Sequence, residues 1–121
     1  MSLTLYGITN CDTVKRSRAW LAAQGAAVRY HDFKREGVPP AELDRWLSAV
    51  GRDRLINRQG TTWRKLDEAI RSRADSDAGA RALMLEQASV IKRPVVQWPD
   101  GSISVGFDES DWARRLSARP G

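Results

Sequence analysis

The alternation of apolar and polar residues divides the first part of the chain into a strand, a helix and a second strand. Residues 3–8 form a short, largely apolar run that is typical of a buried strand. Residues 12–24 have the period of an amphipathic helix, and Gly25 follows as a C-terminal stop. Residues 27–33 alternate between apolar and polar side chains and predict a second strand. This order predicts a β-α-β unit with parallel strands.

A helical block is expected next, over residues 34–90. It begins with a turn that contains Gly37 and two prolines, and prolines are tolerated at the start of a helix. Glycines and polar stretches then separate segments in which apolar residues recur at helical spacing. The expected elements are a helix ending at Val50, a connector at 55–60, a helix capped by Thr61 and Thr62 that runs through Ile70, a loop at 71–79, and a helix at 80–88.

The last part of the chain predicts a β-hairpin and a final helix. Residues 95–98 are apolar, 99–102 (PDGS) are typical of a hairpin turn, and 102–107 alternate as a partner strand. Residues 108–111 resemble a capping box that begins a helix. A β-α-β unit followed by a β-β-α unit makes an α/β fold with a four-stranded mixed sheet. This is the thioredoxin-like plan, with a helical insertion between its halves.

Length and composition limit the class of protein. A chain of 121 residues fits one domain, so we expect a single thioredoxin-like domain over 1–121, with 34–90 as a helical insertion within it. No apolar run approaches the roughly 20 residues of a membrane helix, and the N-terminus lacks the features of a signal peptide. A single cysteine excludes an internal disulfide and a cysteine-rich zinc site. We therefore expect a cytoplasmic protein with no metal and no membrane contact.

The formal net charge of +5 raises the question of nucleic-acid binding. The 20 basic residues are interleaved with 15 acidic ones, and the chain contains no motif that reads a nucleic acid. We expect no direct contact with nucleic acid. A cationic surface of this kind also suits small anionic substrates.

Cys11 is the candidate nucleophile. It lies where the first strand gives way to a helix, and the unpaired N–H groups and positive dipole end of a helix favour thiolate over thiol. Lys15 lies about one helical turn later and adds positive potential. Thr13 can offer its hydroxyl or N–H to the sulfur, and Asn10 either holds the turn or contacts substrate. The alternative is a buried, inert cysteine, and the predicted strand-to-helix position favours the nucleophile.

Two further candidates lie far away in the sequence. In the thioredoxin plan, a proline directly before the third strand is usually cis and brings backbone groups of the preceding residue near the nucleophile, which assigns this role to Arg93 and Pro94. The alternative is a proline that only ends the preceding segment. Arg58, in the 55–60 connector, has a planar fork that suits an oxyanion or a carboxylate. Taken singly, a solvated surface arginine is the more common explanation.

Three separated segments, YGITNCDTVKRSRAWL, LINRQGTTWRKL and IKRPVVQWPDGSISVGF, resemble the arsenate reductase (ArsC)/Spx family. The resemblance is closest to its YffB-type branch, in which NCDT and GTTWRKL are typical. It covers nearly the whole chain, with the motifs in the family's order, and implies a thioredoxin-like fold.

The resemblance also implies roles for individual residues. In glutaredoxin-coupled arsenate reductases of this family, a cysteine attacks arsenate and three arginines hold the oxyanion. Cys11 matches the nucleophile, and Arg58 and Arg93 match two of the arginines. The third would fall near Gly106, where this chain has no arginine, which argues against arsenate as substrate. Many Spx-type regulators carry a Cys-x-x-Cys switch, but here Val14 takes the second position, so a dithiol switch is impossible.

The expected function is a monothiol reductase. Because the chain has no second cysteine, an external thiol must resolve the intermediate that forms at the first one. Glutathione fits as reductant or co-substrate, since it is anionic and its peptide backbone can pair with the 93–94 segment. The resemblance also implies a glutathione-dependent thiol reductase. Glutaredoxin is a candidate partner. The alternatives are a glutaredoxin-coupled arsenate reductase and a non-catalytic Spx-like regulator, and RNA polymerase is a partner only under the latter.

Overall fold

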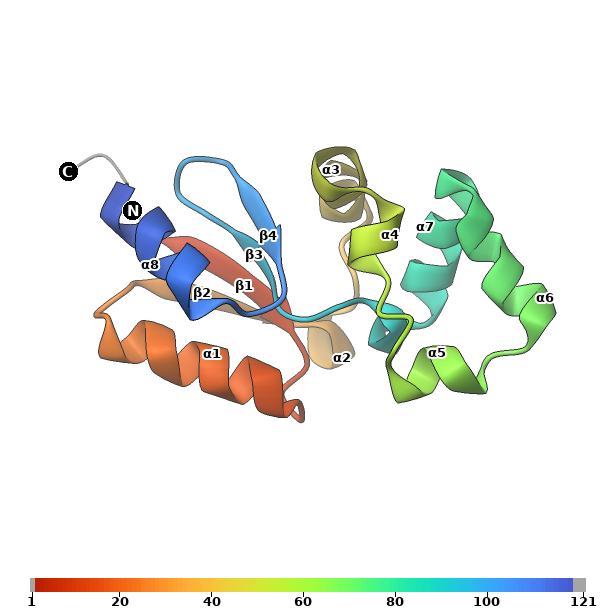
Figure 1. The fold of residues 1–121 in the computed structure, drawn as a ribbon, viewed down its shortest axis with the longest axis horizontal. Coiled ribbons are helices and arrows are strands. Elements are labelled where there is room, and N and C mark those ends of the chain that lie inside the picture. The colour runs from red at the N-terminus through yellow and green to blue at the C-terminus, as the bar shows by residue number, and fades with distance from the viewer. Residues whose placement is uncertain (1, 119–121) are drawn as a thin grey trace. The chain divides into compact units, whose positions relative to one another are not determined.

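The computed structural model describes residues 2–118 and divides into two compact units (Figure 1). The sheet unit consists of the chain up to Asp32 together with the chain from Arg93 onward, and the helical unit consists of Phe33–Lys92. The predicted domain over 1–121 also includes residues 1 and 119–121, which lie outside the described part. Whether the two units act as one domain stays a prediction.

The sheet unit contains a four-stranded mixed sheet with the order β2-β1-β3-β4, which confirms the predicted fold class. Strand β1 pairs in parallel with β2, from Leu3 opposite Val28 to Gly7 opposite Asp32. The other two ladders, β1 with β3 and β3 with β4, are antiparallel. The strands are β1 (Leu3–Gly7), β2 (Val28–Asp32), β3 (Val95–Gln97) and β4 (Ile103–Val105).

Helices α1 (Asp12–Ala23) and α8 (Glu109–Ala118) supply apolar side chains that pack against this sheet. Because side chains alternate along a strand, Leu3 and Leu5 of β1 lie on the same face of the sheet and meet both helices in one core. The core cluster consists of Leu3, Leu5, Val14, Leu21, Val96, Trp98 and Trp112.

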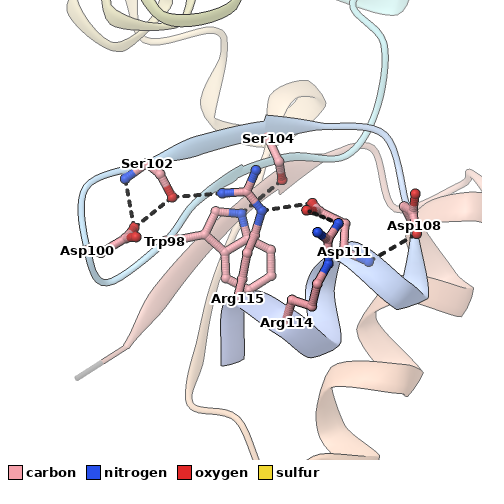
Figure 2. A network of polar contacts seen from close by, with 8 residues as sticks. All are labelled: Trp98, Asp100, Ser102, Ser104, Asp108, Asp111, Arg114 and Arg115. Atoms are coloured by element: carbon pink, nitrogen blue, oxygen red, sulfur yellow. Dashed lines mark hydrogen bonds and ion pairs between the residues drawn. The ribbon is translucent and has the colours of Figure 1, made fainter. Parts of the chain in front are cut away.

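A polar network joins α8 to the β3–β4 hairpin (Figure 2). Arg115 donates from Nη1 to Ser102 Oγ at 2.8 Å and from Nε to Asp111 Oδ2 at 2.8 Å. Its guanidinium also lies 5.6 Å from the ring centre of Trp98, whose indole N–H donates to the buried Ser104 Oγ at 2.9 Å. One arginine thus stabilises the hairpin and the helix together, which fixes the strand that follows Arg93.

The helical unit departs from the sequence prediction in its second half. The helix expected from Thr61 through Ile70 is broken at Leu66, whose backbone is extended, and its N-cap is Gly60 rather than a threonine. The polar stretch 71–79 is largely helical instead of a loop. The elements are α2 (Phe33–Glu36), α3 (Pro40–Val50), α4 (Arg52–Leu55), α5 (Thr61–Lys65), α6 (Glu68–Arg71), η1 (Ser72–Asp75), α7 (Asp77–Glu86) and η2 (Ala88–Val90).

Side-chain caps explain these differences. Arg71 donates from Nε to the Trp63 carbonyl at 3.2 Å and from Nη2 to the Arg64 carbonyl at 2.5 Å, so it satisfies the open C-terminal end of α5. Ser76 Oγ accepts from Gly79 N at 3.1 Å and begins α7 earlier than apolar spacing alone indicates. Polar residues that suggest a loop therefore serve as helix caps.

Gly7 marks a close approach between β1 and the first turn of α1, and this contact yields the first prediction. A Cβ at Gly7 would lie 2.8 Å from Val14 Cγ2, and Val14 is fully buried. We predict that Gly7→Ala lowers the free energy of unfolding by about 1–3 kcal/mol because it overpacks this contact. Urea denaturation measures the change.

The control is the double variant Gly7→Ala/Val14→Ala. If the overlap is the cause, shortening Val14 relieves it, and the double variant loses less stability than the sum of the two single variants. Additive losses would show that Gly7 matters for another reason.

Candidate active site

Cys11 is the N-cap residue of α1, at the turn that follows β1. Its backbone is extended, with φ −134° and ψ 122°, and its carbonyl accepts the first helical hydrogen bond from Lys15 N at 2.9 Å. The predicted strand-to-helix position is therefore confirmed. The side chain is half-buried and packs against the apolar core of the sheet unit.

The surroundings of Cys11 favour its ionised form. Partial burial raises the pKa of the thiol, but the N–H groups of Val14 and Thr13 and the hydrogen bond and charge of Arg93 lower it, and the balance leaves the pKa below its ordinary value. The attraction of these N–H groups is stronger for a charged sulfur than for a neutral one, and a helix N-terminus therefore favours the thiolate.

Arg93 comes to the thiol from the distant half of the sheet unit. The antiparallel pairing of β1 with β3, which places Tyr6 opposite Val95, runs the residues ahead of β3 alongside those that follow β1. The Arg93–Pro94 peptide bond is cis, as the thioredoxin plan implied, and Pro94 is buried. The structure therefore brings Cys11 and Arg93 together from opposite ends of the sequence.

Gly106 lies near the place where the family resemblance expects a third arginine. Its φ is +86°, in the left-handed region that favours glycine, and its N–H donates to the Pro94 carbonyl at 2.9 Å. The position thus contributes a backbone turn that holds the Arg93–Pro94 segment. An arginine side chain there would strain the backbone.

The remaining candidates of the sheet unit lie around the start of α1. Asn10 and Lys15 are exposed, and Thr13 is half-buried, with its N–H among the groups that lower the pKa of Cys11. Their contact with a substrate stays a prediction.

Arg58 belongs to the helical unit, where two neighbours hold its side chain. It donates from Nη2 to Asp53 Oδ1 at 3.0 Å, and its guanidinium lies 4.9 Å from the ring centre of Trp63. The side chain remains exposed at 41%. A role beside Cys11 stays a prediction from the family motif.

Sequence reasoning missed one polar contact next to the site. Thr9 Oγ1 donates to Asp32 Oδ2 at 3.0 Å, and Asp32 is buried. The available signal was an aspartate at the carboxyl end of the second parallel strand, because the carboxyl ends of neighbouring parallel strands lie at one edge of a sheet.

Residues 2–118 contain no cluster of three or more histidine, cysteine or acidic side chains suited to a metal ion. Within the same range, no helix has the length and apolar character needed to cross a bilayer.

Comparison with known proteins shows which family the chain belongs to. The sequence model of the ArsC family matches residues 6–115. An uncharacterized protein from Haemophilus influenzae is 36% identical over 110 residues, which cover 91% of this chain and 95% of that protein. Among solved structures, a protein named YffB is 45% identical with a TM-score of 0.88, covering 95% of this chain and 99% of that one. An arsenate reductase (ArsC) related protein from Brucella melitensis is 46% identical with a TM-score of 0.74, covering 96% and 95%.

A thioredoxin-like sheet with a thiolate-favouring cysteine at its first strand-to-helix turn defines a thiol-based oxidoreductase. The match over most of the chain makes the assignment more specific: the chain belongs to the ArsC family.

The contact between Arg93 and Cys11 gives the second prediction. Removing the cation removes a group that stabilises the thiolate, so Arg93→Met raises the pKa of Cys11. The rate of alkylation by iodoacetamide, measured against pH, follows the thiolate fraction, and its midpoint should move to higher pH in the variant.

Arg16→Met serves as the control, because it removes an equal charge from an exposed position close to Cys11 in the sequence. Its midpoint should stay near that of the parent protein. An equal shift in both variants would mean that net charge acts on the thiol and that the specific contact with Arg93 does not.

Proposed function

We propose that this protein is a cytoplasmic monothiol reductase that uses Cys11 as nucleophile and glutathione as reductant. The observation that carries the proposal is a single cysteine, held at a helix N-terminus beside Arg93, in a chain with no second cysteine. Such a thiol can attack once, and a separate thiol must complete the cycle.

The proposed reaction has two exchange steps. In the first, the Cys11 thiolate attacks the glutathione sulfur of a mixed disulfide, a Cys11–glutathione disulfide forms, and the other thiol leaves as a thiolate. In the second, the thiolate of another glutathione attacks that disulfide and releases oxidised glutathione and the Cys11 thiolate. The net reaction converts one mixed disulfide and one reduced glutathione into the free substrate thiol and oxidised glutathione, so the attacking glutathione is the reductant.

Glutathione suits the charge and shape of the site. It carries carboxylates, and Arg93 is a half-buried cation beside the sulfur that receives it. It also has a peptide backbone that can pair with the main chain at Arg93–Pro94, which the Gly106 N–H holds through the Pro94 carbonyl. Glutaredoxin is a candidate partner for the second step.

Arsenate reduction is the second candidate, because one of the similar structures is described as arsenate reductase related. The chemistry of the site favours it less. A tetrahedral oxyanion needs several donors around it, and the sequence has no arginine near Gly106, where the family resemblance expects a third one.

The third prediction tests the proposal directly. With hydroxyethyl disulfide and glutathione, the parent protein should catalyse exchange, Cys11→Ser should have no activity, and intact mass should show one glutathione bound to the parent protein only. Arsenate replaces the disulfide in a parallel assay coupled to glutaredoxin. Turnover of arsenate without disulfide exchange would overturn the glutathione-disulfide assignment in favour of the oxyanion.

The fourth prediction concerns Arg58, whose role rests on the family motif. Its ion pair with Asp53 is largely exposed, so Arg58→Met should change stability by no more than about 1 kcal/mol. If Arg58 binds substrate, the variant should raise KM about tenfold or more, since a charge-assisted hydrogen bond is lost. Arg54→Met, which removes an exposed arginine from α4, is the control and should leave KM unchanged.

A further inference from the structure

The loop between β1 and Cys11 is held by side chains of β2. The β1–β2 ladder ends at the pair Gly7 and Asp32, so the residues that follow Gly7 lie beyond the regular backbone pairing. Thr9 Oγ1 lies 3.0 Å from Asp32 Oδ2 and 3.1 Å from the hydroxyl of Tyr30. These two contacts continue the attachment of the loop to β2 past the end of the ladder.

The hydrogen bonds of this cluster have one consistent direction. A threonine hydroxyl has one proton, and an ionised carboxylate only accepts. Thr9 therefore donates to Asp32. Because that proton is used, the Tyr30 hydroxyl must donate to Thr9. Valine at position 9 would interrupt the chain of donors, whereas serine would preserve it.

Burial and charge make the cluster sensitive to such a change. Asp32 is only 6% exposed, and a buried carboxylate needs its hydrogen-bond donors. The Arg18 guanidinium lies 3.9 Å from the ring centre of Tyr30, which extends the cluster onto α1. The cluster thus joins the loop, β2 and the helix that Cys11 caps.

The position of the loop matters because the groups that act on the sulfur have a short range. Thr9 lies two residues before Cys11, and the N–H of Val14 and the side chain of Arg93 act through hydrogen bonds. Hydrogen bonds weaken steeply with distance and angle, so a small displacement of the loop weakens the support of the thiolate.

We propose that Thr9 and Asp32 are positioning residues for Cys11, which hold the β1–α1 loop so that the sulfur stays within reach of the first turn of α1 and of Arg93. This proposal rests on the proposed function, in which Cys11 is the nucleophile. It assigns a role to two residues that act through the loop and do not touch the substrate.

The fifth prediction compares Thr9→Val with Thr9→Ser. The readout is the iodoacetamide alkylation rate of Cys11 in the folded protein as a function of pH. Thr9→Val should slow alkylation at pH 7 by about threefold to tenfold and move the midpoint to higher pH, while Thr9→Ser should restore the parent profile. An unchanged midpoint in a folded Thr9→Val protein would overturn the proposal.

Asp32→Asn separates positioning from a simple charge effect. If Asp32 acted only as a nearby anion, removing its charge would favour the thiolate and move the midpoint to lower pH. If Asp32 positions the loop, the weaker acceptor should move the midpoint to higher pH, and the effect should not add to that of Thr9→Val. A shift to lower pH would remove Asp32 from the proposal.

Ser104→Ala controls for loss of stability. It deletes the hydroxyl that accepts the Trp98 indole N–H. Ser104 belongs to the same sheet unit as Thr9, but it is part of the polar network of Figure 2. This variant should lower the melting temperature and leave the alkylation profile unchanged. An equal shift in Ser104→Ala would show that destabilisation alone moves the midpoint and would overturn the positioning role.

Alkylation needs neither glutathione nor a disulfide substrate, so this test is independent of turnover. If exchange activity is absent but Thr9→Val still shifts the midpoint, the proposed function fails and the positioning role stands. If exchange activity is present and the midpoint does not move, the positioning role alone fails.

Discussion

The central constraint on this structure is the support of a negative charge on Cys11 by groups that are far apart in the sequence. A half-buried sulfur loses hydration, and burial by itself raises the pKa of the thiol. The first turn of α1 and the side chain of Arg93 outweigh this loss together. The sheet is what makes that combination possible, because β1 leads into the helix and its antiparallel partner β3 begins directly after Arg93–Pro94.

The core, the helices and the hairpin of the sheet unit all help to position the groups around the Cys11 sulfur. The apolar core fixes α1 and α8 against one face of the sheet, and Gly7 allows α1 to approach the end of β1. Arg115 holds α8 to the hairpin that continues from the Arg93 segment. Interactions that do not touch the sulfur therefore determine the distances around it.

The fold of the sheet unit and the strand-to-helix position of Cys11 could be predicted because their signals are local. The strand at 3–8, the turn at Cys11 and the hairpin at 99–102 each follow from a few neighbouring residues. The contact between Thr9 and Asp32 could not be predicted in the same way, because it depends on the register that places Gly7 opposite Asp32. In the helical unit, the polar composition of residues 71–79 predicted a loop, but Arg71 and Ser76 cap helices. Such side-chain caps cannot be recognised from the spacing of apolar residues.

The contrast between Arg93 and Gly106 bears on the choice of substrate. Arg93 lies ahead of β3 and Gly106 directly follows β4, and the Gly106 N–H donates a hydrogen bond to the Pro94 carbonyl. A tetrahedral oxyanion needs charge from several directions. An electrophilic sulfur needs a thiolate, an aligned leaving group and one anchor for the ligand. The sequence has no arginine near Gly106, and this favours the proposed thiol–disulfide exchange over oxyanion chemistry.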